Sequence, residues 1–257
     1  MLQNRPMSVT PAVTTPPVTP FGAHVARVSG YMSASAAVTA VVVWLTHRLV
    51  PQSFEDNGIL WLCLIVIPLV VAILLARRFK PMSAPAAQGL LVAQSALIGL
   101  AFGMAFLPLA PASMASVFAV LAVSFGAVGL WTAARRRPFS AVAVVLVMCL
   151  VGFGLATFLL TAFWPDGIAY LLFALGLGPM PPDTAPSGGL EWIMSICCIM
   201  VFSAIYAAVL ARTRQSFVPP VGGEAAERLA VQDARSLYAD FLLVLLAVIW
   251  GARANRR

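Results

Sequence analysis

Charged residues are scarce in this sequence, acidic ones above all. Of its 257 residues only 9 are Asp or Glu and 16 are Lys or Arg, whereas 61% are hydrophobic. The mean hydropathy of +0.95 lies far outside the range of soluble domains. So few charges cannot cover the surface of a soluble protein, and we therefore interpret the chain as an integral membrane protein.

The side chains that catalysis and metal binding require are also few. The sequence has 2 His and 4 Cys, and every Cys lies inside an apolar run, where a thiol acts as a small hydrophobe. No pair has the spacing of a zinc site, and no HExxH, phosphate-loop or nucleophile–base arrangement is present. We therefore expect that the protein is not an enzyme and that it has no cofactor and no metal site. His24 and His47 are too isolated to be metal ligands.

Apolar runs recur along the chain after a start rich in Pro and Thr. Residues 1–24 lack a helical period and predict a flexible tail, and residues 25–257 then form one transmembrane domain. A spanning helix needs about 20 apolar residues, so the sequence predicts an all-α polytopic membrane protein with seven transmembrane helices. The seven runs are 30–50, 59–76, 86–110, 112–134, 140–163, 190–211 and 236–251.

Two segments leave the number of crossings open. The last run, of about 16 residues, is short for a crossing. It either crosses the membrane shielded by neighbouring helices, or dips into the membrane and returns. Residues 168–180 are shorter still and end before Pro181 and Pro182. We interpret them as an interfacial or re-entrant segment, with an eighth crossing as the alternative.

The net charge of +7 comes from short basic clusters between the apolar runs. Nucleic-acid-binding proteins instead carry a basic stripe with stacking aromatic residues, so the lipid bilayer is the expected partner and nucleic acid is not. Basic clusters mark cytoplasmic loops, which puts the loops after the second, fourth and sixth runs, and the N-terminus, in the cytoplasm. A seventh crossing leaves the basic C-terminus outside, against this trend. The clusters are Arg77, Arg78 and Lys80; Arg135, Arg136 and Arg137; and Arg212 and Arg214.

Asp240 is the one acidic residue that the sequence places at membrane depth. It follows Tyr238, which points elsewhere on a helix and is expected to pack, and it precedes the apolar residues 242–250. A charge near the middle of a spanning helix costs roughly 2.5 to 3.5 kcal/mol, so it normally faces a protein interior or a water-filled cavity. Asp240 is therefore a candidate functional residue. Other polar residues expected to hydrogen-bond within the bundle are Thr39, Gln94 and Ser95.

The segment around Asp240 resembles the end of the Bax inhibitor-1 family. Residues 236–241 read Ser-Leu-Tyr-Ala-Asp-Phe, followed by apolar residues, Gly251 and Arg253. The family ends in a helix of the type Ser-Leu-Tyr-Leu-Asp-Phe, followed by Gly and Arg. Weaker similarities make the resemblance extend over roughly residues 25–255; they lie at residues 30–32, 115–125 and 202–204.

The resemblance implies a bacterial inner-membrane protein in which six helices surround a central C-terminal helix. In the family the acid of the last helix, here Asp240, pairs with a second acid in the sixth helix and interacts with an arginine that ends the second span. Arg77 matches that arginine, and its contact with Asp240 is expected; the alternative is a simple cytoplasmic anchor. Val209 stands where the second acid would be. The acidic pair is therefore missing, and Val209 is expected to face Asp240.

Two functions follow from the resemblance. The first is a pH-influenced leak for calcium or other cations, with a cytoplasmic-side gate around Asp240 and Arg77. Calcium binds through several oxygen ligands, and this core offers one carboxylate, which weakens that interpretation. The alternative is a non-conducting protein that binds and modulates a membrane-anchored ATP-dependent protease. The tail at residues 1–20 would suit such binding, because disordered ends are accessible to partners.

Overall fold

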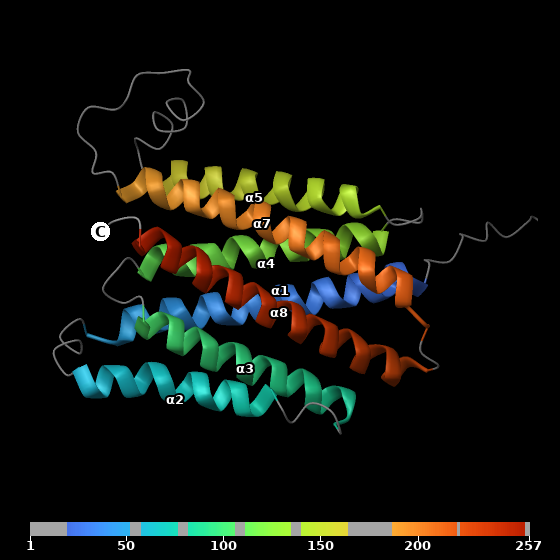
Figure 1. The fold of residues 1–257 in the computed structure, drawn as a ribbon, viewed down its shortest axis with the longest axis horizontal. Helices are drawn as coiled ribbons and strands as arrows, with labels where there is room; N and C mark the ends of the chain where they lie inside the picture. Colours follow the sequence, from blue (N-terminus) through green and yellow to red (C-terminus); the bar gives the residue numbers. More distant parts are fainter. Residues whose placement is uncertain are drawn as a thin grey trace, which may run out of the picture.

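The computed structural model describes residues 20–51, 58–76, 82–105, 111–134, 140–163, 187–219 and 222–254. The described residues form seven helices that lie side by side in one elongated bundle (Figure 1). The helices are α1 (Pro20–Leu49), α2 (Gly58–Ala76), α3 (Ala84–Ala105), α4 (Pro111–Ala134), α5 (Ala141–Phe163), α7 (Ser187–Ser216) and α8 (Gly223–Ala254).

Each of the seven apolar runs corresponds to one helix, so the all-α class is confirmed for the described residues. The largest difference lies in the last helix. It has 32 residues and begins at Gly223, well before the apolar run that starts at Ser236. At 1.5 Å per residue it is about 48 Å long. The first helix also begins early, at Pro20, so residues 20–24 of the predicted tail belong to it. Residues 168–180 lie outside the described residues.

Length and composition qualify four of these helices as membrane spans: α1, α2, α3 and α4. The surface of α2 shows why such a helix belongs in a membrane. Its side chains are almost all apolar, and most of them are exposed, as at Ile59, which is 85% exposed, and Ile67, which is 59% exposed. Apolar side chains this exposed are stable in lipid and not in water. The chain is therefore a polytopic membrane protein.

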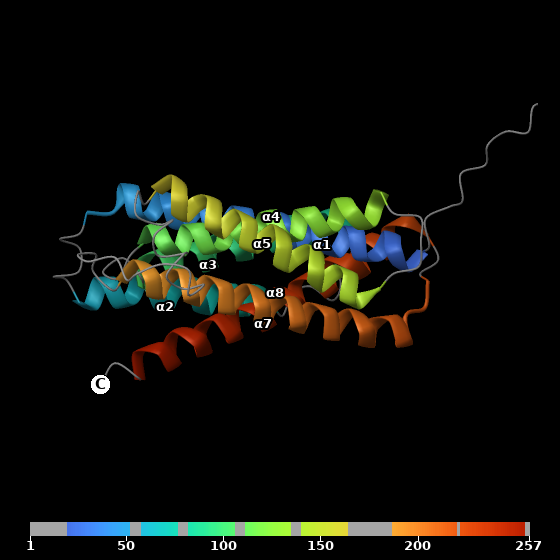
Figure 2. The ribbon, with the colours of Figure 1, turned by 90° about the horizontal axis from the view of Figure 1, so that it is seen from above.

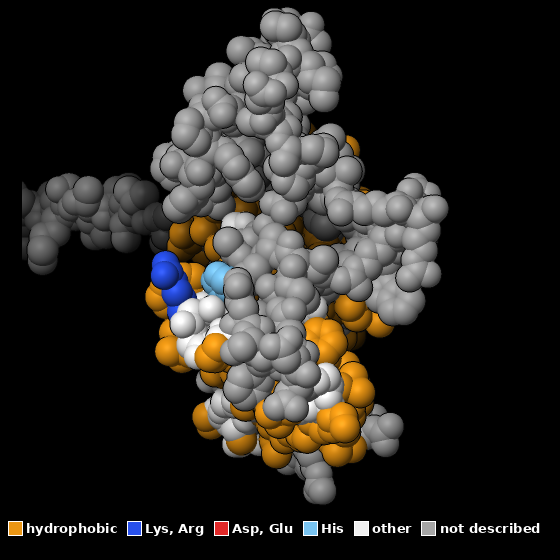
Figure 3. All heavy atoms as spheres, turned by 90° about the vertical axis from the view of Figure 1, so that its left-hand side faces the viewer, with side chains coloured by type: hydrophobic (Ala, Val, Ile, Leu, Met, Phe, Trp, Pro, Cys, Tyr) orange, Lys and Arg blue, Asp and Glu red, His pale blue; other side chains and the backbone are white. Residues whose placement is uncertain are grey.

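Consecutive helices run in alternating directions along the bundle (Figure 1). Three helices, α2, α4 and α7, end where α1 begins, and α8 ends at the opposite side. The ends of α2 and α4, which two of the basic clusters follow in the sequence, and the end of α7, which contains Arg212 and Arg214, therefore share one side of the bundle. Figure 3 faces the opposite end, where the described side chains are mostly hydrophobic and few charges are visible. This arrangement is the one that the basic clusters predict, whereas the membrane side of each terminus stays a prediction.

The bundle is organised around α1, which packs against α4, α3 and α8. Small residues let these helices approach closely, as is common in membranes. On α3, Gly99 and Gly103 lie against the backbone and side chains of Thr39 and Thr46. On the other side, the hydroxyl of Ser33 donates a hydrogen bond to the carbonyl oxygen of Ala122 on α4, at 2.7 Å.

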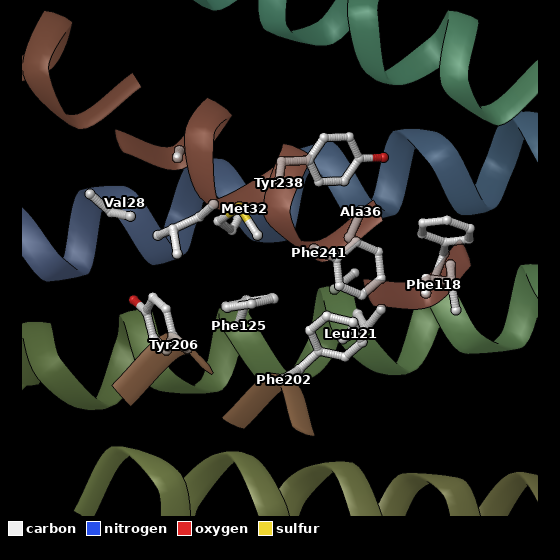
Figure 4. Close-up of a cluster of buried hydrophobic side chains, with 14 of the residues drawn as sticks. Val28, Met32, Ala36, Phe118, Leu121, Phe125, Phe202, Tyr206, Tyr238 and Phe241 are labelled. Carbon is white, nitrogen blue, oxygen red and sulfur yellow. The ribbon is translucent and has the colours of Figure 1, made fainter. Parts of the chain in front are cut away.

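Aromatic side chains from three helices fill the space between α1, α4, α7 and α8 (Figure 4). Phe241 of α8 lies between Phe202 of α7 and Phe118 of α4, with ring centroids 4.1 and 5.7 Å away. Tyr206 of α7 meets Phe125 of α4 edge-on at 5.2 Å. The buried face of α8 thus joins the main core. Its position at the centre of a six-helix ring stays a prediction.

We predict that Gly99→Ala destabilises the bundle. The added Cβ would lie 2.9 Å from the Cβ of Val42 and 3.0 Å from the carbonyl oxygen of Thr39, so α1 and α3 must separate, at a cost of about 1–3 kcal/mol. Gly89→Ala on the same helix is the matched control, because nothing lies within 4 Å of its added Cβ. Thermal unfolding in detergent should show a lower Tm for Gly99→Ala alone. Equal Tm values for the two variants would contradict this packing.

Candidate functional site

Between Ala230 and Leu245, α8 has a buried face and an exposed face. Buried residues recur every three or four positions, which is the pattern of one helix face packed on a bundle. They are Ala230, Val231, Ala234, Leu237, Tyr238, Phe241 and Leu245. The exposed face carries Ser236, Ala239, Asp240 and Leu243. The candidate residue Asp240 is therefore on the side of α8 that turns away from the core.

Asp240 has no hydrogen bond or ion pair with any residue that the structure describes. It lies about half-way along α8, since that helix begins well before its apolar run. Seen from above, the C-terminal half of α8 leans away from α1 (Figure 2). The carboxylate of Asp240 is thus exposed on a helix segment in which the residues that follow it in the sequence are apolar. Such a group needs water or a cation beside it.

The other two predicted site residues do not meet Asp240 among the described residues. Arg77 lies outside them. Val209 on α7 is half-buried and packs against the main core. The contact between Phe202 and Phe241 brings these residues of the antiparallel helices α7 and α8 to the same level. Val209 is seven residues beyond Phe202 on α7. That Val209 faces Asp240 stays a prediction.

The hydroxyl of Thr39 on α1 joins three helices. Its oxygen is hydrogen-bonded to the hydroxyl of Tyr238 on α8, and it donates toward the carbonyl oxygens of Ser35 and Ser95, each at 3.0 Å. One hydroxyl has one hydrogen, and Thr39 directs it to these carbonyls. The hydroxyl of Tyr238 is therefore the donor to Thr39. This network connects α8 to α1 and, through Ser95, to α3.

The expectation of hydrogen bonds at Thr39 and Ser95 is thus confirmed, and Tyr238 packs as predicted. Gln94 differs, because its buried Oε1 has no hydrogen-bond partner among the described residues. A second contact of this kind joins α1 to α7, where the hydroxyls of Ser29 and Tyr206 are hydrogen-bonded and fully buried. In the part of the chain that the structure describes, no three His, Cys, Asp or Glu side chains gather as metal ligands.

Sequence reasoning missed a contact at the start of α1. Nε2 of His24 lies 2.9 Å from Oδ2 of Asp233 on α8. The two residues are 209 positions apart, so no local pattern connects them. The one feature of the sequence that bears on Asp233 is that Asp233 and Asp240, two turns apart, lie on the same side of α8.

We predict that Tyr238→Phe weakens the attachment of α8 to α1. The variant keeps the ring and removes the donor to Thr39, and hydrogen bonds between membrane helices average about 0.6 kcal/mol. A double-mutant cycle with Thr39→Val in thermal unfolding should show coupling of about that size. Tyr206→Phe is the matched control, since its partner is Ser29. Coupling of Thr39→Val to Tyr206→Phe, or its absence with Tyr238→Phe, would contradict the assignment.

The chain is similar to two other bacterial proteins over most of its length. It is 26% identical over 236 residues to the inner membrane protein YbhL of Escherichia coli, which covers 90% of this chain and 92% of that one. It is 25% identical over 224 residues to a protein of Deinococcus radiodurans, which covers 87% of each chain. No solved structure matches the chain.

A family model supports the same relationship. The model described as "Inhibitor of apoptosis-promoting Bax1" matches residues 22–250. This range includes every described helix from near the start of α1 to near the end of α8. The chain therefore belongs to the Bax inhibitor-1 family.

Proposed function

We propose that this protein is a multi-pass protein of the bacterial inner membrane, that it is not an enzyme, and that it lets cations leak along a path past Asp240. The name of the Escherichia coli relative, an inner membrane protein, supports the location. Calcium is the candidate ion. The gate lies on the cytoplasmic side of the membrane, around Asp240, with Arg77 as the candidate counter-ion.

One observation carries this proposal: the carboxylate of Asp240 is exposed and has no partner among the described residues. A charge placed in lipid is costly, whereas a charge that faces a water-filled path is not. A carboxylate between low-dielectric walls attracts cations and raises their local concentration. Asp240 therefore suits a path for cations better than a purely structural role.

The same geometry favours passage over tight binding. Calcium takes six to eight oxygen ligands in proteins, and one carboxylate supplies two at most. Water and backbone carbonyls must provide the rest, so the ion is held weakly and leaves easily.

We predict that Asp240→Asn lowers calcium entry into liposomes that contain the purified protein. The amide keeps the volume of the side chain and removes its charge. Two opposite charges 4 Å apart attract each other by about 4 kcal/mol at an effective dielectric constant of about 20. We therefore expect the calcium flux to fall at least about tenfold.

Glu224→Gln is the matched control, because Glu224 is an exposed carboxylate at the start of the same helix. It should keep the flux of the unchanged protein. Equal flux through Asp240→Asn and the unchanged protein would refute the role of Asp240. If the unchanged protein conducts no better than empty liposomes, the leak is wrong, and binding to a membrane-anchored ATP-dependent protease becomes the better proposal.

A further inference from the structure

His24 is buried at the point where α1, α8 and the segment before α8 meet. Its side chain is 4% exposed, and its Nε2 lies 2.9 Å from Oδ2 of Asp233, whose side chain is 36% exposed. An ionised carboxylate only accepts hydrogen bonds, so Nε2 of His24 carries the hydrogen. Asp233 remains in partial contact with solvent, whereas the imidazole does not.

An aromatic side chain from the α7–α8 connection covers the imidazole. The ring of Phe217 lies 5.1 Å from that of His24, and Phe21 of α1 meets Phe217 edge-on at 5.3 Å. The connection then turns at Gly222, whose φ of 98° suits glycine. The start of α1, the connection and the first part of α8 are thus held together around one histidine.

No other titratable group that the structure describes forms a hydrogen bond or an ion pair with His24 or Asp233. One turn before and after Asp233 on the same side of α8 stand Leu229, Ala230, Ser236 and Leu237, none of them charged. The described parts of α3 and α4 contain no charged residue. Among the residues that the structure describes, the other charged groups on the helix ends at this side of the bundle are Arg27 on α1, Arg212 and Arg214 on α7, and Glu224, Glu227, Arg228 and Arg235 on α8.

We propose that the contact between His24 and Asp233 is a proton-operated latch that holds the first part of α8, residues 223–235, on the start of α1. Histidine is the side chain whose charge ordinarily changes between pH 5 and 8. When His24 gains a proton, its hydrogen bond to Asp233 joins opposite charges and becomes about twice as strong. Burial opposes the charged imidazole, but the adjacent carboxylate neutralises it and remains partly hydrated.

The latch acts on the helix that carries Asp240. Asp240 follows Asp233 by two helical turns on the same side of α8, so a change in how the first part of α8 is held is transmitted to it through a continuous helix. The sign is definite: acidification tightens the contact between α8 and α1. The latch does not rest on the proposed leak, because its test measures the helix and not the flux.

Hydrogen exchange of the full-length protein in lipid nanodiscs tests the latch. After correction for the intrinsic effect of pH on amide exchange, peptides from residues 223–235 should exchange about fivefold more slowly at pH 6 than at pH 8. Peptides from α4, which has no charged residue, should show no such difference. This comparison needs no variant. The proposal would be overturned if the ratio of the exchange rates at pH 6 and pH 8 were the same in both helices, or if residues 223–235 exchanged faster at pH 6.

Variants assign the effect to the pair. His24→Gln and Asp233→Asn should each abolish the difference between pH 6 and pH 8, and the double variant His24→Asp with Asp233→His should restore it. His47→Gln is the control, since His47 is the second of the 2 histidines and lies at the other end of α1. If His47→Gln removes the difference, or if both His24→Gln and Asp233→Asn preserve it, the assignment to this pair is wrong.

Discussion

The bundle depends on how its few polar side chains are satisfied where water is absent. Apolar surfaces do not by themselves hold helices together in lipid, because the lipid tails are as apolar as the side chains. Close packing at small residues and specific hydrogen bonds must do so. Thr39 combines both: Gly99 packs against its backbone, and its hydroxyl links α1 to α3 and α8. With Ser29, which reaches Tyr206 on α7, it makes α1 the helix on which the others are assembled.

The same contacts explain how α8 presents Asp240. Tyr238 and Phe241 anchor one face of α8, the first to Thr39 and the second between Phe202 and Phe118. Asp240 lies between these anchors in sequence and hence on another side of the helix. Its exposure is therefore a consequence of the packing. The protein holds α8 by its apolar and hydroxyl-bearing face, and leaves the carboxylate of Asp240 exposed.

Hydropathy alone predicts the seven helices, because lipid imposes long apolar segments on any chain that crosses it. The same signal misplaces the start of α8, since residues 223–235 are amphipathic and its apolar run begins later. Asp240 stands out from sequence because a charge is rare in such a run. The pairing of His24 with Asp233 cannot be seen in the sequence, because the fold joins positions 209 residues apart. Whether Val209 faces Asp240 depends on the register of α7 and α8, and the contacts that set this register, such as that between Phe202 and Phe241, join residues far apart in the sequence.

The account rests on Asp240 facing water at membrane depth, and the accessibility of that position tests it most directly. In a protein whose own cysteines are replaced, Asp240→Cys should react with a charged, membrane-impermeant thiol reagent in liposomes. Leu243→Cys, on the same helix and also exposed in the bundle, at 66%, should resist that reagent and react with a lipid-soluble one. If the charged reagent labels position 240 rapidly and does not label position 243, the result supports a water-filled path. Resistance of position 240 to the charged reagent, together with reaction toward the lipid-soluble one, would place Asp240 in lipid and contradict the account.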